Sequence, residues 1–287
     1  MMKHTSLALA AAGLVACLQP AAASDWNTPQ EPFALYGNTY YVGTHGLSAV
    51  LITSNEGHIL IDGGSDQSAP QIVRNIRQLG FRVEDIRFIL NSHAHFDHAG
   101  GIAELQRLSG AEVLAGSAAV PVLRSGQASK GDPQFGGLPP MAPIAKVRAV
   151  RDGEVITVGP LAVTMHATPG HTQGGASWTW TAAGQEKPAR MVYADSLNAL
   201  GAKSFRYSGD PAYPTARADI ERSIATLAGL PCDVLVSAHP EGSDLWQRYA
   251  RRAALGEAAF IDTTACRTYA DKARARLATQ LAGEAAR

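Results

Sequence analysis

The most informative stretch of the sequence is Asn91-Ser92-His93-Ala94-His95-Phe96-Asp97-His98-Ala99-Gly100-Gly101. In an extended chain, residues two apart project to the same side, so His93 and His95 can reach one ion, while Asp97 and His98 lie one turn further on. Imidazole nitrogens and a carboxylate oxygen at about 2.0–2.2 Å suit Zn²⁺, and iron and manganese accept similar sets. The stretch therefore indicates two metal ions and is hard to explain as a solvated polar loop.

Two further histidines stand where expected strands give way to loops. One is in Thr168-Pro169-Gly170-His171-Thr172, and the other is in Val236-Ser237-Ala238-His239-Pro240. In open α/β sheets, ligands bind at the ends of strands, so side chains distant in sequence can converge there. We expect His171 and His239 to complete the metal sites begun by the first cluster.

Strand and helix signals alternate along the chain, which predicts an α/β fold. In the first half we expect strands at 48–53, 58–62 and 87–90, a loop over 91–101, and helices from Pro70 to Leu79 and from Gly101 to Leu108. In the second half we expect strands at 154–158, 161–168, 176–181, 191–194 and 234–237, with helices over 215–227 and 268–282. The stretch 126–143 has four prolines and four glycines. It is therefore expected to be a structured surface loop, of the kind that often flanks a binding site.

Composition excludes several classes of protein. Of the 287 residues, 46% are hydrophobic and 17% are charged, with 25 basic residues against 25 acidic ones. Such a chain buries a core rather than staying disordered. It also lacks the excess of positive charge that nucleic-acid binding needs, so no nucleic-acid partner is expected. After the N-terminal region, no apolar run is long enough to predict a transmembrane segment.

The N-terminal residues resemble an export signal. A basic start at Met1–Lys3 precedes a short apolar stretch, and Ala21-Ala22-Ala23 offers small residues for cleavage. We expect residues 1–23 to be a signal peptide, residues 24–287 to form the folded domain, and the protein to be periplasmic. An alternative is that Leu14-Val15-Ala16-Cys17 is a lipobox, which would make Cys17 a lipid anchor.

Export also bears on the cysteines that remain after processing, Cys232 and Cys266. An oxidising compartment favours a disulfide between them. The alternative is that they are two separate buried thiols, which behave as small hydrophobic side chains.

The metal motif and its two distant histidines resemble the metallo-β-lactamase superfamily. Four further stretches are similar to those of its subclass B3: Tyr36–Gly43, Gly46–Val50, Tyr193–Leu197 and Leu230–Asp233. The region of Ser196 carries a cysteine ligand in subclass B1, and its absence here agrees with B3. The resemblance implies a four-layer αβ/βα sandwich, a dinuclear zinc site at its edge and a disulfide between Cys232 and Cys266.

The same resemblance implies roles for individual residues. His93, His95 and His171 would hold the first zinc, and Asp97, His98 and His239 the second. A metal-bound hydroxide oriented by Asp97 would hydrolyse the amide bond of β-lactam antibiotics and so confer resistance. Candidate contacts to this small-molecule substrate are Ser196, Asn198 and Lys203.

Two other functions stay open at this point. One is a lactonase or thioesterase of the same superfamily, and the other is a periplasmic zinc-binding module without catalysis. Lactonases and thioesterases place a bridging aspartate in a segment similar to the one around Asp195. Asp195 is therefore either a metal ligand or, as we favour, a buried structural carboxylate.

Overall fold

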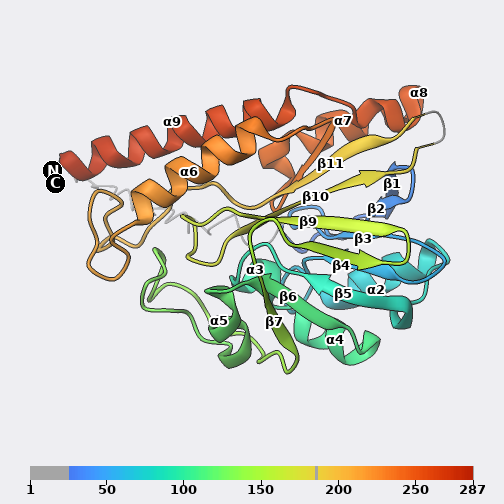
Figure 1. Cartoon of the computed structure of the whole chain (residues 1–287), viewed down its shortest axis with the longest axis horizontal. Helices are drawn as coiled ribbons and strands as arrows, with labels where there is room; N and C mark the ends of the chain where they lie inside the picture. Colours follow the sequence, from blue (N-terminus) through green and yellow to red (C-terminus); the bar gives the residue numbers. More distant parts are fainter. Residues whose placement is uncertain (1–25, 185–186, 287) are drawn as a thin grey trace, which may run out of the picture.

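Two β-sheets pack face to face in the computed structural model, which describes residues 26–184 and 187–286 (Figure 1). The seven-stranded sheet has the order β1-β2-β3-β4-β5-β6-β7, with β1 Phe33–Tyr36, β2 Thr39–Tyr41, β3 Val50–Ile52, β4 His58–Ile61, β5 Ile86–Leu90, β6 Glu112–Gly116 and β7 Val147–Val150. Strands β4 to β7 are parallel and the earlier strands pair antiparallel.

The five-stranded sheet has the order β12-β11-β10-β9-β8. Its strands are β8 Val155–Val158, β9 Leu161–Ala167, β10 Ala176–Ala182, β11 Ala189–Ala194 and β12 Val234–Ser237. The neighbours β8 to β11 are antiparallel, and β12 pairs parallel to β11.

Helices cover the outer face of each sheet. The seven-stranded sheet carries α2 Ala69–Gln78, α4 Ile102–Ser109 and α5 Ala119–Ser125. The five-stranded sheet carries α6 Ala216–Gly229 and α9 Ala265–Ala285. The shorter helices are α3 Phe96–Ala99, α7 Leu245–Ala250 and α8 Arg252–Leu255, with 3₁₀ turns η1 Val83–Asp85, η2 Pro240–Ser243 and η3 Gly256–Phe260.

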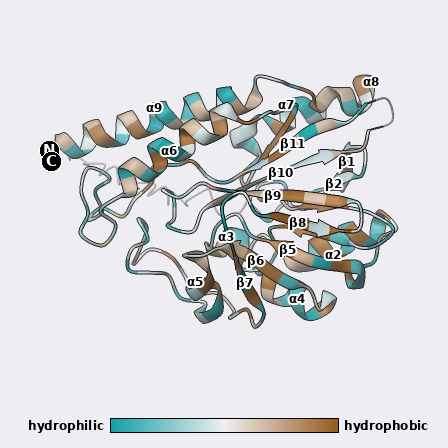
Figure 2. Cartoon of the chain, in the orientation of Figure 1, coloured by the Kyte–Doolittle hydropathy of each residue, from teal (hydrophilic) through white to brown (hydrophobic). Residues whose placement is uncertain are grey.

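The alternation of side chains along each strand builds three apolar layers. In β3, Val50 and Ile52 enter the core between the sheets, whereas Leu51 packs toward the helices. In β11, Tyr193 points between the sheets and Val192 toward α6 and α9. Since both faces of these strands are covered, their residues are apolar except for the exposed Arg190 in β11. Along α6 and α9, hydrophobic and hydrophilic residues alternate (Figure 2).

This arrangement confirms the predicted four-layer αβ/βα sandwich. Strands β3, β4, β5 and β8 to β12 and helices α2, α4, α6 and α9 match the expected elements, with ends shifted by a few residues. One expectation was incomplete, because residues 96–99 of the expected loop form the single helical turn α3. Strands β1, β2, β6 and β7 and helix α5 were not anticipated. They are three to seven residues long, too short for a clear period.

The predicted disulfide joins Cys232, just before β12, to Cys266 in α9. It fastens an outer helix to the sheet that it covers. The proposed signal peptide at 1–23 and the candidate lipid anchor Cys17 lie outside the described residues. Across 26–184 and 187–286, no helix has the length and apolar character needed to cross a membrane.

Candidate metal centre

The predicted metal ligands converge at one edge of the sandwich. His93 and His95 follow the end of β5, His171 follows β9, and His239 follows β12. Asp97 and His98 sit on the one-turn helix α3, which begins directly after His95. The sheets thus bring together side chains that are up to 146 positions apart, counted from His93 to His239 (239 − 93).

The first cluster consists of His93, His95 and His171. All three are buried, and one ring nitrogen of each lies within 4.8 Å of the corresponding nitrogens of the other two. The ring centroids of His93 and His171 are 4.8 Å apart, and the rings are nearly perpendicular. Three imidazoles that face one another in this way are a donor set typical of zinc.

The second cluster consists of Asp97, His98 and His239. Oδ2 of Asp97 lies 3.1 Å from Nε2 of His98 and 3.3 Å from Nε2 of His239. The two Nε2 atoms are 3.2 Å apart. Ligand atoms at about 2.0–2.1 Å from a tetrahedral ion are about 3.3 Å from one another. The spacing of these three atoms therefore fits a single small cation.

Hydrogen bonds fix the outward nitrogen of four of the five histidines. Nδ1 of His93 lies 2.8 Å from Oδ1 of Asp195, and Nδ1 of His171 lies 2.8 Å from the Asn198 carbonyl. For the other two, Nε2 of His95 lies 2.9 Å from Oδ2 of Asp132 and Nδ1 of His239 lies 3.3 Å from the Gly46 carbonyl. Each acceptor selects the tautomer that leaves the opposite nitrogen free to bind a metal.

The fifth histidine, His98, is fully buried, and its Nδ1 has no hydrogen-bond partner among the described residues. The nearest carboxylate oxygen, Oδ2 of Asp62, is 3.9 Å away. Asp62 instead holds the start of the motif, because its carboxylate accepts hydrogen bonds from the Ser92 amide at 2.7 Å and the Ser92 hydroxyl at 2.6 Å. The hydroxyl of Tyr193 donates to it at 2.8 Å.

The electrostatics of the site match metal binding. Burial lowers the pKa of His93 well below its usual value and lowers the pKa of His171 to about 3, so both are neutral near pH 7, as metal ligands must be. Burial alone would raise the pKa of Asp97, but His98 and His239 outweigh it and hold the pKa well below the usual range. Asp97 is therefore a carboxylate. Burial disfavours a charged His98, yet Asp97 and Asp62 raise its pKa, which marks a place that favours positive charge.

The candidate substrate contacts lie on the segment that follows β11. Ser196 is buried, and its amide donates to Oδ1 of Asp195 at 2.7 Å. Asn198 contributes its carbonyl to His171. Lys203 is exposed on the same segment.

Sequence reasoning missed the acceptors Asp132 and Gly46. Asp132 lies in the loop over 126–143, which the prolines and glycines had marked. No local pattern connects it to His95, because the contact depends on the path of the loop in space.

Comparisons with known proteins agree with this geometry. Residues 42–184 match the family model described as the metallo-β-lactamase superfamily. The structure of MEM-A1, a subclass B3 metallo-β-lactamase isolated from a soil metagenome library, is 69% identical, with a TM-score of 0.91 over 91% of this chain and 99% of that chain. The structure of the metallo-β-lactamase SMB-1 bound to 2-mercaptoethanesulfonate is 50% identical, with a TM-score of 0.88 over 91% of this chain and 99% of that chain.

Curated relatives are more distant. A hydroxyacylglutathione hydrolase of Anaeromyxobacter dehalogenans is 32% identical over 126 residues, which is 44% of this chain and 38% of that protein. An N-acyl homoserine lactonase of Bacillus cereus is 32% identical over 74 residues, which is 18% of this chain and 30% of that protein. The chain thus spans less than half the length of either enzyme.

Proposed function

This chain belongs to the subclass B3 metallo-β-lactamases, and from that membership we propose that it uses two zinc ions to hydrolyse the amide bond of β-lactam antibiotics. The observation that carries the proposal is the convergence of five histidines and one aspartate into two adjacent clusters. Identities of 50–69% to metallo-β-lactamases over 91% of the chain support the same reaction class.

Each of the two clusters would hold one zinc ion. We assign the first zinc to His93, His95 and His171, and the second to Asp97, His98 and His239. When bound, such ions polarise a carbonyl oxygen, stabilise a leaving group and lower the pKa of water to about 7. The chain therefore needs no serine nucleophile.

We assign Asp97 as the catalytic carboxylate. One of its oxygens, Oδ2, lies against His98 and His239, so the other is assigned to accept a hydrogen bond from the attacking water. Because the pKa of Asp97 is held low, the group is a proton acceptor throughout the neutral range. It therefore orients the water as the water attacks the carbonyl carbon of the lactam.

We assign substrate binding to the segment after β11. Ser196 and Asn198 would position water or substrate beside the clusters, and Lys203 would attract the substrate carboxylate. Ser196 and Asn198 are adjacent to the atoms that orient His93 and His171, so groups held there would lie close to the reacting centre.

Hydrolysis of a lactone or thioester is the competing proposal, since the curated relatives carry those names. That reading places Asp195 as a ligand that bridges two metals. Oδ1 of Asp195 is instead engaged by His93 and by the Ser196 amide, which favours the β-lactamase proposal. A metal-binding module without catalysis is disfavoured by the identities of 50–69% to metallo-β-lactamases over 91% of the chain.

We further propose that residues 1–23 direct export to the periplasm, with lipidation at Cys17 as the alternative, and that residues 24–287 form the enzyme domain. In that compartment, the activity would protect a cell against β-lactams. The disulfide between Cys232 and Cys266 supports an oxidising location.

Hydrolysis of a chromogenic cephalosporin by the zinc-loaded protein tests the proposed function. A homoserine lactone and a glutathione thioester serve as competing substrates under the same conditions. Turnover of the cephalosporin alone is the expected result. Cleavage of only the lactone or the thioester would replace the β-lactamase assignment, and no turnover of any substrate would favour the module without catalysis.

A further inference from the structure

Asp132 links a surface loop to a predicted metal ligand. The residue is only 8% exposed, although it belongs to the glycine- and proline-rich loop over 126–143. Oδ2 of Asp132 lies 2.9 Å from Nε2 of His95, which is itself only 3% exposed. A buried carboxylate that accepts from a histidine N–H fixes both the orientation of the ring and its tautomer.

The same carboxylate organises the turn around it. Oδ1 of Asp132 accepts a hydrogen bond from the Gln134 amide at 2.8 Å, and its carbonyl accepts one from the Phe135 amide at 2.9 Å. Its own amide donates to the Ser129 carbonyl at 3.0 Å. The turn over 129–135 is therefore built around the residue that contacts His95, and it leaves the Phe135 side chain 46% exposed.

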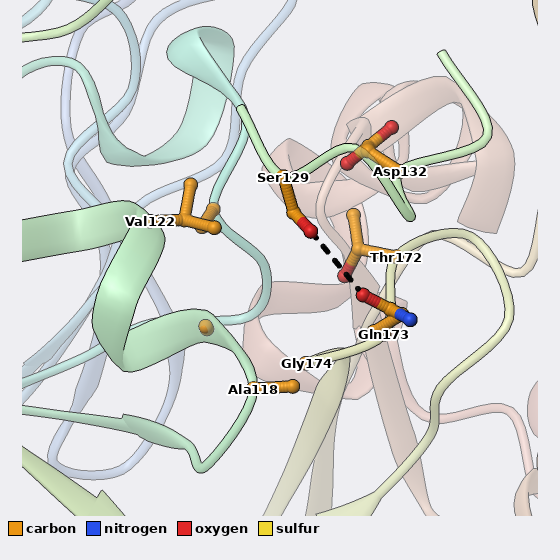
Figure 3. A pocket seen from close by; sticks show the side chains of 9 residues that line it. Ala118, Val122, Ser129, Asp132, Thr172, Gln173 and Gly174 are labelled. Carbon is orange, nitrogen blue, oxygen red and sulfur yellow. Dashed lines mark hydrogen bonds between the residues drawn. The ribbon is translucent and has the colours of Figure 1, made fainter. Parts of the chain in front are cut away.

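Two further contacts join this turn to the rest of the site. The Ala202 amide, on the segment that carries the candidate substrate contacts, donates to the Pro133 carbonyl at 2.7 Å. The Ser129 hydroxyl lies 3.5 Å from Oε1 of Gln173, the residue two positions after His171. Ser129, Asp132 and Gln173 all line one small pocket (Figure 3). The loop thus contacts both the segment that follows β9, which carries His171, and the segment that follows β11.

His95 is oriented in the opposite way to the other two histidines of its cluster. His93 and His171 present Nδ1 to their acceptors, which leaves Nε2 for a metal. His95 presents Nε2 to Asp132, which leaves Nδ1. Without an acceptor at that place, a neutral imidazole has no reason to keep its proton on Nε2, and the nitrogen needed by the metal would be protonated for part of the time.

We propose that Asp132 is a positioning residue that holds His95 in the Nε2-protonated form and so couples metal binding in the first cluster to the order of the loop over 129–137. The proposal rests on the metal centre of the proposed function. Coupling between two binding equilibria is reciprocal, so zinc stabilises the loop as much as the ordered loop strengthens zinc binding.

Zinc affinity of three variants tests the first half of the proposal. Asp132→Leu removes the acceptor at similar size, and loss of a carboxylate behind a ligating histidine typically weakens metal binding by about 10–100-fold. Asp132→Asn keeps one acceptor oxygen without the charge, so we expect an intermediate loss. Asp271→Asn makes the same chemical change on α9, where the side chain is 71% exposed, and should leave zinc affinity unchanged. Competition with a chromophoric chelator measures the affinity of each site.

Hydrogen exchange tests the second half and does not depend on activity. The Phe135 and Gly137 amides are hydrogen-bonded within the turn, so zinc should slow their exchange in the parent protein. This protection by zinc should be lost in Asp132→Leu and kept in Asp271→Asn. The Nε2–H signal of His95 should be sharp in nitrogen-15 NMR spectra of the parent and of Asp132→Asn, and should broaden or disappear in Asp132→Leu.

The outcomes separate this inference from the proposed function. A parent that binds two zinc ions, together with an Asp132→Leu variant of unchanged zinc affinity and unchanged exchange, overturns only the role of Asp132. A parent that binds no zinc overturns the proposed function itself. If Asp132→Leu does not fold, Asp132→Asn tests the proposal instead. A zinc affinity equal to that of the parent, together with equal protection of the loop amides by zinc, would contradict the proposal.

Discussion

Oδ1 of Asp195 lies 2.8 Å from Nδ1 of His93, and both side chains are buried. The sequence left Asp195 open between a metal ligand and a structural carboxylate. Its position behind His93 gives it a third role, because Oδ1 accepts a hydrogen bond from the Nδ1–H group of His93. The same oxygen also accepts from the Ser196 amide, so the metal centre and the candidate substrate segment share one anchor.

Replacing Asp195 should therefore weaken metal binding without removing a ligand. We expect Asp195→Asn to lower zinc affinity by about 10–100-fold, with the loss confined to the site that contains His93. Chelator competition would reveal one weakened and one parent-like zinc. Asp233→Asn supplies a control at a carboxylate far from the histidines, paired with Arg190. Loss of both zinc ions in folded Asp195→Asn would support a bridging ligand instead.

Metal content should follow the division of the six ligands into two sets. The purified protein is expected to hold two zinc ions, to lose activity on chelation and to recover it when zinc is restored. His171→Ala removes a donor from the first cluster only, so we expect about one zinc per chain by elemental analysis. Full activity of the parent protein at one zinc per chain would contradict a mechanism that requires both ions.

The Cys232–Cys266 disulfide spans 34 positions of sequence. In the chain-entropy model, a loop of this length contributes about 3–4 kcal/mol to the free energy of unfolding. The double variant Cys232→Ala, Cys266→Ala should therefore unfold at lower urea concentration, with the slope of the transition increased because the unfolded chain is less compact. A change in unfolding free energy below about 1 kcal/mol would show that the bond does little to stabilise the sandwich.

The helices and strands that could be predicted are those with a distinctive local sequence pattern. Apolar strands covered on both faces, such as β3 and β4, produce short continuous runs, and α2 carries Pro70 in its first turn. Helix α5 escaped prediction because it has seven residues, among them Pro121, and owes its position to packing of Val120 and Leu123 on the sheet. Its tertiary contacts override weak local preference.

The metal centre was likewise only partly predictable from the sequence. His93, His95, Asp97 and His98 lie within six consecutive positions, so their spacing alone indicated a metal. The groups that orient them are not contiguous with them: Asp195 is 102 positions from His93, and Asp132 is 37 positions from His95. The local sequence singled out Asp195 without revealing its contact with His93, and nothing in the local sequence distinguished Asp132 from an ordinary turn residue. The candidate ligands could thus be proposed from the sequence, while the groups that orient them required the fold.

Glu284 gives the stability of the chain a defined pH dependence. Its carboxylate accepts hydrogen bonds from the Tyr207 and Ser208 amides, both at 2.8 Å, and so holds the loop after the candidate substrate segment. Burial alone would raise the pKa of Glu284, but these hydrogen bonds lower it overall. A carboxyl with a lowered folded pKa contributes stability above its unfolded pKa of about 4.3, and that contribution is lost as pH falls through the folded pKa.

We therefore expect Glu284→Gln to cost about 1–2 kcal/mol of unfolding free energy at pH 7 and progressively less below about pH 4. Urea unfolding of zinc-free protein measures this difference without a contribution from metal loss in acid. Glu221→Gln, in an ion pair with Arg217 whose Glu221 side chain is 49% exposed, should change stability little at any pH. A Glu284→Gln difference that stayed constant from pH 7 to pH 3 would show that the charge is unimportant.

The catalytic assignment is decided by Asp97 and Ser196 together. Asp97→Asn keeps the size of the side chain and one oxygen, but it removes the charge that contacts His98 and His239. The change should weaken the second zinc and misorient the attacking water, so we expect kcat for carbapenem hydrolysis to fall by at least about 10²-fold even at saturating zinc. Ser196→Ala removes only a hydroxyl on the substrate segment, so zinc content should stay at two and a measurable rate should survive. Kinetics and elemental analysis of both variants distinguish the roles. If zinc-saturated Asp97→Asn kept the parent kcat, Asp97 would not be the residue that orients the water. If Ser196→Ala lost zinc, Ser196 would act in metal binding rather than only in positioning water or substrate.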